Sequence, residues 1–284
     1  MRLALAPRFA LLLLVLVGFG VRVWRLDAQS LWYDEGFSVW LASQSLADIT
    51  ARTAADIHPP AYYYLLHFWL VPFGNSEFAL RFFSLVPSLI TIPLTFLVAR
   101  RLFDQTTGLL AALLATLSPM NLWYAQEARM YALVTLLGLL SAYLFLRWLE
   151  RPTWRWWILL PLVNTLAVYT HFLAFFLVAF QQVYFLIWWS GQEVRWRGLG
   201  AAWASAIVTF IAYAPWLQAT VTRFNQDESY FEGALRLSEV WRKTFIMFAS
   251  GHSMLENDAL PLAAFFAVFA LAGLLFAGKI RSDT

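Results

Sequence analysis

The stretch WWILLPLVNTLAVYTHFLAFFLVAFQQVYFLIWWS, residues 156–190, contains no Asp, Glu, Lys or Arg. As one α-helix rising about 1.5 Å per residue it would be about 52 Å long, whereas the hydrocarbon core of a bilayer is about 30 Å thick. A charge-free run of this length is therefore typical of two consecutive membrane-spanning helices. We predict that the two helices join near His171.

The rest of the 284-residue chain is also apolar, since 61% of its residues are hydrophobic and 13% are charged, against about a quarter charged in a soluble domain. This composition predicts an all-α integral membrane protein. The first apolar run follows basic residues, as in a signal peptide, but no cleavage motif of small residues precedes Arg22, so we expect it to remain as a helix. About eight spans are predicted, at residues 7–24, 79–99, 107–123, 131–149, 156–172, 173–190, 198–217 and 259–278.

The distribution of charge predicts the topology of these spans. When the N-terminus is placed inside, most Lys and Arg lie at the cytoplasmic ends of the spans and most acidic residues lie outside. We therefore expect a multi-pass protein of the plasma (inner) membrane with a cytoplasmic N-terminus and long outer-face loops at residues 25–78 and 218–258. The basic balance of the chain follows from this orientation, so no nucleic-acid partner is expected.

Two adjacent carboxylates, Asp34 and Glu35, stand just beyond the first apolar run. Ionisable groups at a membrane face are costly and usually mark a site, so we interpret the pair as the reactive centre of an enzyme acting on the outer face. We predict a short amphipathic helix at residues 35–45 and another starting after residues 58–60, His-Pro-Pro, which together roof a cavity. Asp34 has two interpretations: it caps the first of these helices, or its carboxylate takes a proton from an acceptor hydroxyl.

A second polar segment, residues 121–130, lies on the same predicted face. Its Arg129 is a permanently charged guanidinium at headgroup level, which suits a phosphate. The alternative is an arginine that snorkels to the interface or pairs with Glu127. Glu127 and Tyr131 are four residues apart and would share one face of a helix. We count Tyr124 of this segment among the cavity residues.

Four histidines, His58, His67, His171 and His252, also map to the outer face. Their spacing is not that of a metal motif, so the cofactor is unknown and a divalent metal stays open. A lone histidine such as His171 is more often a hydrogen-bonded structural residue than a ligand. The chain has no Gly-rich phosphate loop, so we expect no organic cofactor and no nucleotide-sugar donor.

Five short motifs occur in order along this face. Together they resemble those of the polyprenyl-phosphate-dependent glycosyltransferases of the GT-C class. The nearest are the family 39 and related bacterial enzymes, which are similar to protein O-mannosyltransferases and lipid A aminoarabinose transferases. The resemblance extends over about residues 10–220, the membrane module of these enzymes. The motifs are Tyr33-Asp34-Glu35, His58-Pro59-Pro60, Glu77-Phe-Ala-Leu-Arg-Phe, Tyr124-Ala-Gln-Glu-Ala-Arg-Met-Tyr131 and Tyr169-Thr-His171.

The resemblance implies a donor in which a sugar is linked to a polyprenyl phosphate, with the headgroup outside and the tail in a groove between membrane helices. The sugar would pass, with inversion, to a hydroxyl of a protein, lipid or glycan acceptor, and membrane lipid is the remaining partner. No metal ligand is assigned. The implied site residues are Asp34 and Glu35 as catalytic groups, Arg129, His171 and Tyr131 at the donor phosphate, and His58, Glu127 and Tyr124 elsewhere in the cavity.

Enzymes of this class are usually longer and carry a C-terminal extramembrane domain, so we expect residues 1–284 to form a single transmembrane domain without that part. Two alternatives stay open: a transporter or lipid flippase, and an inactive, truncated relative that serves as a subunit. Transporters tend to hold ionisable groups near the bilayer midplane, whereas the candidates here cluster at the outer surface, which favours an enzyme.

Overall fold

The computed structural model describes residues 6–190, 197–226, 236–251 and 253–282, and within these residues the regular secondary structure is all helical. The predicted all-α membrane fold is confirmed. In chain order the helices are α1 (Ala6–Val23), α2 (Tyr33–Ala42), α3 (Leu46–Ala54), α4 (Ala61–Phe73), α5 (Glu77–Leu102), α6 (Gln105–Leu117), α7 (Pro119–Ala125), α8 (Tyr131–Glu150), α9 (Trp154–Thr170), α10 (Ala174–Ser190), α11 (Arg197–Gln226), α12 (Leu237–Ser250) and α13 (Glu256–Ser282).

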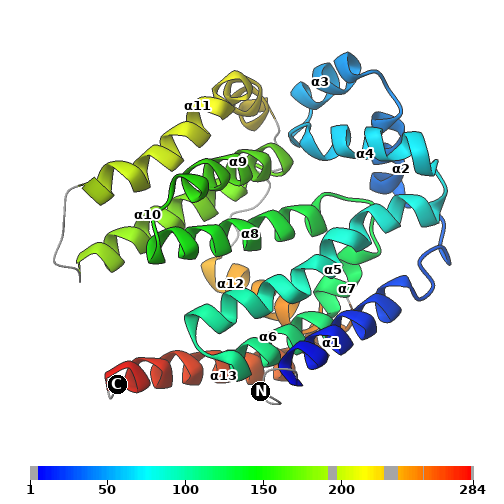
Figure 1. Cartoon of the computed structure of the whole chain (residues 1–284). Helices are drawn as coiled ribbons and strands as arrows, with labels where there is room; N and C mark the ends of the chain where they lie inside the picture. The colour runs from blue at the N-terminus through cyan, green and yellow to red at the C-terminus, as the bar shows by residue number, and fades with distance from the viewer. Residues whose placement is uncertain (1–5, 191–196, 227–235, 252, 283–284) are drawn as a thin grey trace.

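The long helices form a bundle in which α5 packs against both α6 and α8, and α9 packs against both α8 and α11. Helix α1 lies along α5 and α6, while α12 packs on α13 and reaches α7. The short helices α2, α3 and α4, which we call the roof, gather at the end of the bundle where α1 ends and α5 begins (Figure 1). The candidate site lies under this roof.

Fewer helices than expected are long and apolar enough to cross a bilayer. Among the described residues four qualify, within α5, α8, α11 and α13, and a fifth is obtained if α6 and α7 form one bent span. By this criterion the prediction of eight spans was too high. The run 156–190 does divide near His171, but α9 and α10 have 17 residues each. At 1.5 Å per residue that is about 26 Å, short of a core of roughly 30 Å.

The predicted span 107–123 is broken where α6 meets α7, at a bend of 55°. Pro119 lacks the N–H that would continue α6, and it occupies the first position of α7, where that N–H is not needed. The Ser118 hydroxyl caps the new helix by accepting a hydrogen bond from the Asn121 N–H. The break therefore follows from a local proline and serine signal that an apolarity count does not register.

The free end of α6 is completed by Arg22 of α1, which is fully buried. Its guanidinium donates to the carbonyl oxygens of Ala115 and Thr116, at 3.1 Å each, and to the Ser88 hydroxyl at 3.0 Å. These carbonyls have no partner within α6, and a cation at a helix C-terminus also interacts favourably with the helix dipole. Arg22 thus holds the bend in place and directs the chain into residues 126–130.

The roof is a packed structure and not a loose loop. Helices α2 and α4 match the two helices predicted for it, whereas α3 lies where no helix was predicted. The roof shares a hydrophobic core with the start of α5 and with residues 126–130, so these three parts are fixed relative to one another. Fully buried members of this core are Leu41, Ile49, Tyr62, Tyr63, Leu66, Leu80, Ala128 and Met130.

Candidate active site

Asp34 is the second residue of α2 and does not cap it. The cap position belongs to Trp32, and the helix begins at Tyr33, so the interpretation of Asp34 as a helix cap was wrong. Its side chain is 35% exposed, and its Oδ2 lies 3.8 Å from Nη2 of Arg129. The carboxylate is therefore accessible at the site and has a loosely placed cation beside it.

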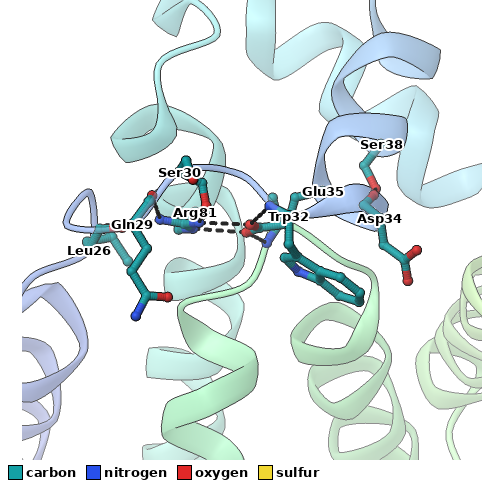
Figure 2. Close-up of polar contacts among 9 residues, drawn as sticks. Leu26, Gln29, Ser30, Trp32, Asp34, Glu35, Ser38 and Arg81 are labelled. Atoms are coloured by element: carbon teal, nitrogen blue, oxygen red, sulfur yellow. Dashed lines mark hydrogen bonds and ion pairs between the residues drawn. The ribbon is translucent and has the colours of Figure 1, made fainter.

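Glu35 is buried, with 1% of its surface exposed, and both of its oxygens are engaged. Arg81 of α5 donates to Oε1 from Nε at 2.9 Å and to Oε2 from Nη2 at 2.8 Å. The backbone N–H groups of Ala128 and Trp32 donate to Oε1 and Oε2, at 2.9 and 3.3 Å. Figure 2 shows the Glu35 carboxylate directed to Arg81 while the Asp34 carboxylate points away from it. Glu35 thus ties the start of α2 to α5 and to residues 126–130.

Arg81 was not among the predicted site residues, although the Glu77-Phe-Ala-Leu-Arg-Phe motif contains it. It is 5% exposed and uses all of its N–H groups. Besides Glu35, it donates to the carbonyl oxygens of Leu26, Gln29 and Ser30, at 3.0, 2.8 and 3.2 Å (Figure 2). The residue therefore locks the chain between α1 and α2 onto α5.

Arg129 is buried to a similar degree, with 4% of its surface exposed, but its contacts are poor. Its Nη1 lies 3.5 Å from the Asp34 carbonyl oxygen and 3.4 Å from the Ser38 hydroxyl. Its Nε has no hydrogen-bond partner among the described residues. A buried guanidinium normally has its donors satisfied, so within the described part of the chain Arg129 has hydrogen-bonding capacity that is not fully used.

Residues 126–130 connect α7 to α8 without forming a helix, so Glu127 and Tyr131 do not share a helix face as predicted. This segment is held in place at both sides: the side-chain amide of Gln126 donates to the Arg22 carbonyl at 2.9 Å, and the Ala128 N–H donates to Oε1 of Glu35 in the roof at 2.9 Å. Such anchoring positions the side chains of the segment precisely relative to the roof.

The Glu127 side chain is 7% exposed, and its Oε2 has no hydrogen-bond partner among the described residues. Burial is the main cause that raises the pKa of Glu127 to about 7, and the charges of Glu35 and Asp34 raise it further, while Arg129 acts in the opposite direction. Glu127 is therefore a carboxyl group that holds a proton much more tightly than an exposed glutamate does.

The structure brings two predicted histidines together: the ring centroids of His58 and His171 are 5.8 Å apart. The Leu173 N–H donates to Nδ1 of His171 at 3.3 Å, so the other ring nitrogen of the neutral imidazole holds the proton. Burial, followed by the charges of His58 and Arg129, lowers the pKa of His171 to about 4. At neutral pH His171 is thus an uncharged hydrogen-bond donor and not a cation.

The remaining predicted residues complete a continuous cluster beneath the roof. The ring centroid of Tyr131 lies 6.4 Å from that of His171 and 4.6 Å from that of Tyr124. His67 lies apart from them, with its Nδ1 2.8 Å from the Ala42 carbonyl oxygen, and His252 lies outside the described residues. Within the part of the chain that the structure describes, no group of three or more His, Asp or Glu residues could hold a metal ion.

Two tyrosines of α4 were missed by the sequence analysis. Tyr62 and Tyr63 are fully buried, and among the described residues neither hydroxyl makes a hydrogen bond of good geometry, although Ser84 lies near the first and Arg129 near the second. The charge of Arg129 acts on both of them. The motif-based reading passed over them because an aromatic run after Pro60 is typical of an interfacial helix.

No curated protein matches the chain. The family model described as dolichyl-phosphate-mannose-protein mannosyltransferase matches residues 57–218, which is more than half of the chain. The match includes Arg81, Glu127, Arg129 and His171, whereas Asp34 precedes it. Together with the membrane-length helices, this match shows that the chain is a multi-pass membrane glycosyltransferase that belongs to the dolichyl-phosphate-mannose-protein mannosyltransferase family.

Proposed function

We propose that the protein transfers a sugar from a polyprenyl-phosphate-linked donor to a hydroxyl of a protein, lipid or glycan acceptor, with inversion at the anomeric carbon, and that Asp34 is the general base. One observation supports this most strongly. Of the two adjacent carboxylates, Glu35 has both oxygens occupied by buried donors, whereas Asp34 is partly exposed and has a cation 3.8 Å away. Of these two acids, only Asp34 has room for an acceptor hydroxyl, so in this proposal Glu35 holds the site together and does not contact the acceptor.

Arg129 is the proposed site of the donor phosphate. Its Nε is unpartnered and its other contacts are long, so an incoming phosphate can take up to two N–H donors in bidentate fashion. His171 and Tyr131 lie next to this region and would add uncharged donors. The polyprenyl tail would then run between the membrane helices, and the sugar would lie under the roof beside Asp34.

The geometry also supports an order of events. The Arg129 guanidinium faces the Asp34 carboxylate. A phosphate on Arg129 competes for the same guanidinium and leaves the Asp34 carboxylate free to accept a proton. The acceptor oxygen then bonds to the anomeric carbon, its proton passes to Asp34, and the bond between that carbon and the phosphate oxygen breaks with its electron pair on the phosphate. Arg129 stabilises the charge that develops there.

The direct test is glycosyl transfer by the purified protein, with a short-chain polyprenyl-phosphate mannose as donor, since mannose is the sugar in the family's description. Other hexose and pentose donors form the comparison set. Mass spectrometry of co-purified lipid should find a polyprenyl phosphate or its glycoside. The proposal would be contradicted if no polyprenyl phosphate co-purifies with the protein and the protein transfers none of these sugars.

In the proposed orientation the protein lies in the plasma membrane, with its N-terminus in the cytoplasm and the roof on the outer face. It predicts that a cysteine introduced at the exposed Asp48 of α3 reacts with an impermeant maleimide in intact cells or spheroplasts, whereas one at the exposed Gln105 of α6 does not. The chain has no cysteine of its own, so the signal comes from the introduced residue alone. The reverse labelling pattern would invert the topology.

A further inference from the structure

Glu127 is a buried acidic group that the proposed transfer reaction does not use. It projects from a segment that is anchored to α1 through the Gln126 side chain and to Glu35 through the Ala128 N–H, so its position is defined by the fold. Its Oε2 and the Nε of Arg129 are both buried and both lack partners among the described residues. Glu127 and Arg129 are two residues apart, and the charge of Arg129 acts on Glu127, so one ligand that meets both groups would satisfy the two atoms left without partners among the described residues.

The charges around Glu127 leave it without a cation of its own. Arg81 forms an ion pair with Glu35, and Arg129 lies beside Asp34. The groups that act on Glu127 are these two arginines and these two acids, and Tyr124 also senses its charge. A buried carboxylate that lacks a counter-ion is costly, and the protein avoids that cost by keeping the proton on the carboxyl group.

A protonated carboxyl differs from a carboxylate in that it donates a hydrogen bond. We propose that Glu127 binds the glycosyl donor as a carboxylic acid, donating a hydrogen bond to an oxygen of the phosphate held by Arg129, and that donor binding is therefore coupled to uptake of a proton by Glu127. This inference rests on the proposed phosphate site at Arg129. It adds a second phosphate-binding residue and a coupling that the transfer reaction alone does not require.

The direction of the coupling follows from charge. In the free protein the pKa of Glu127 is about 7. A phosphodiester adds a negative charge nearby and occupies Arg129, whose own charge lowers this pKa, so both changes favour the protonated form. Affinity is then highest below pH 7 and weakens by about tenfold for each pH unit above it, until the pKa of the bound state is reached.

The test uses a short-chain polyprenyl methyl phosphodiester, which has no sugar and no group that titrates near neutral pH. Its binding to the detergent-solubilised full chain is measured by titration calorimetry from pH 6 to pH 9, in buffers of different ionisation enthalpy. Wild-type protein should take up about one proton per bound ligand at pH 8. The Glu127→Gln variant should take up no proton. Its affinity should not change with pH and should be close to the affinity that wild type has at pH 6, because the amide N–H also donates a hydrogen bond.

The matched control is Glu150→Gln, an exposed glutamate at the end of α8 that pairs with Arg101. It should retain the wild-type pH profile. Proton uptake or a sloping profile in Glu127→Gln would overturn the inference. A second result would also overturn it: this variant binds the phosphodiester with the pH dependence of wild type but no longer binds the sugar-bearing donor. Glu127 would then contact the sugar and not the phosphate.

Failure of the inference can be separated from failure of the proposed function. If Arg129→Ala abolishes binding of the phosphodiester while Glu127→Gln behaves as wild type, the phosphate site stands and the role of Glu127 falls. If Arg129→Ala binds normally, the phosphate site itself is wrong, and the inference falls with it. Thermal unfolding at pH 6, where Glu127 is largely protonated, verifies that each variant is folded.

Discussion

Two arginine–carboxylate pairs lie under the same roof, and they differ in how well they are satisfied. Arg81 and Glu35 share two short hydrogen bonds, and every other donor of Arg81 meets a backbone carbonyl. Arg129 and Asp34 are 3.8 Å apart, and within the part of the chain that the structure describes the Arg129 Nε has no partner. Both guanidiniums are buried to a similar degree. Burial alone therefore does not distinguish the two arginines, whereas the saturation of their hydrogen bonds does, and this difference is the basis for proposing Arg129 as the binding residue.

The largest loss of stability should follow from breaking the saturated pair. Glu35→Gln leaves the Arg81 cation buried without its counter-ion, which typically costs about 3–5 kcal/mol of the free energy of unfolding. Thermal or denaturant unfolding in detergent measures this loss. The exposed pair of Arg101 and Glu150 supplies the control, since Glu150→Gln should cost less than about 1 kcal/mol. If the free energy of unfolding falls by the same small amount in both variants, Glu35 does not have the structural role assigned to it.

A smaller effect, confined to ligand binding, is expected at the unsaturated pair. Arg129→Ala should weaken donor binding by about 1.5–3 kcal/mol, because hydrogen bonds to a charged group are lost. Arg129→Lys should recover part of the lost affinity, since an ammonium keeps the charge but lacks the two parallel N–H donors of the planar guanidinium. Arg52→Ala, which removes an exposed arginine of α3, is the matched control and should bind as wild type. Unchanged donor affinity in Arg129→Ala would remove the contrast between the two pairs.

A weaker contribution is expected from His171. Because burial lowers its pKa to about 4, it offers a neutral hydrogen bond, and His171→Ala should weaken donor binding by only about 0.5–1.5 kcal/mol. His67→Ala removes an imidazole that lies apart from the cluster and should leave donor affinity unchanged. A loss in His171→Ala as large as that in Arg129→Ala would indicate a charged imidazole and contradict the assigned protonation state.

The subtlest test concerns stability and pH. The pKa of Glu127 is about 7 in the folded protein, above its ordinary value of 4.5, so the folded state holds this proton more tightly than the unfolded state. Its stabilising contribution is complete below about pH 4.5 and is lost as the pH rises to 7. Since glutamine does not titrate, Glu127→Gln should gain melting temperature relative to wild type between pH 5 and pH 8. If the difference in melting temperature between Glu127→Gln and wild type stays constant from pH 5 to pH 8, Glu127 is not a buried group that titrates in this range.

The sequence was sufficient to predict the helical membrane fold, because charge-free runs such as residues 156–190 leave few other structures. It could not give the number of membrane-length helices. That number depends on where helices end, as at Pro119, and on helix lengths near the limit for spanning, as in α9. The residues 126–130 were misread for the same reason, since α7 ends before Glu127 and α8 begins after it.

For the site, the sequence drew attention to Asp34, Glu35 and Arg129 but could not assign different roles to the two adjacent acids. That difference depends on Arg81, which follows Glu35 by 46 residues and meets it only through tertiary structure. Local spacing likewise gave no sign that Glu127 Oε2 would be buried without a partner among the described residues. The contacts on which we base the different roles proposed for these residues are set by packing between distant segments.

The measurement that tests the account most directly is the rate of glycosyl transfer by Asp34→Asn, normalised to folded protein. Asparagine keeps the size of the side chain, and Asp34 makes no tight ion pair, so the variant should fold and bind donor. Its transfer rate should fall by about 10²–10⁴-fold, the usual contribution of a general base, because the amide cannot accept the acceptor's proton. A folded Asp34→Asn variant with near wild-type turnover would show that Asp34 is not the base and would remove the functional half of the comparison.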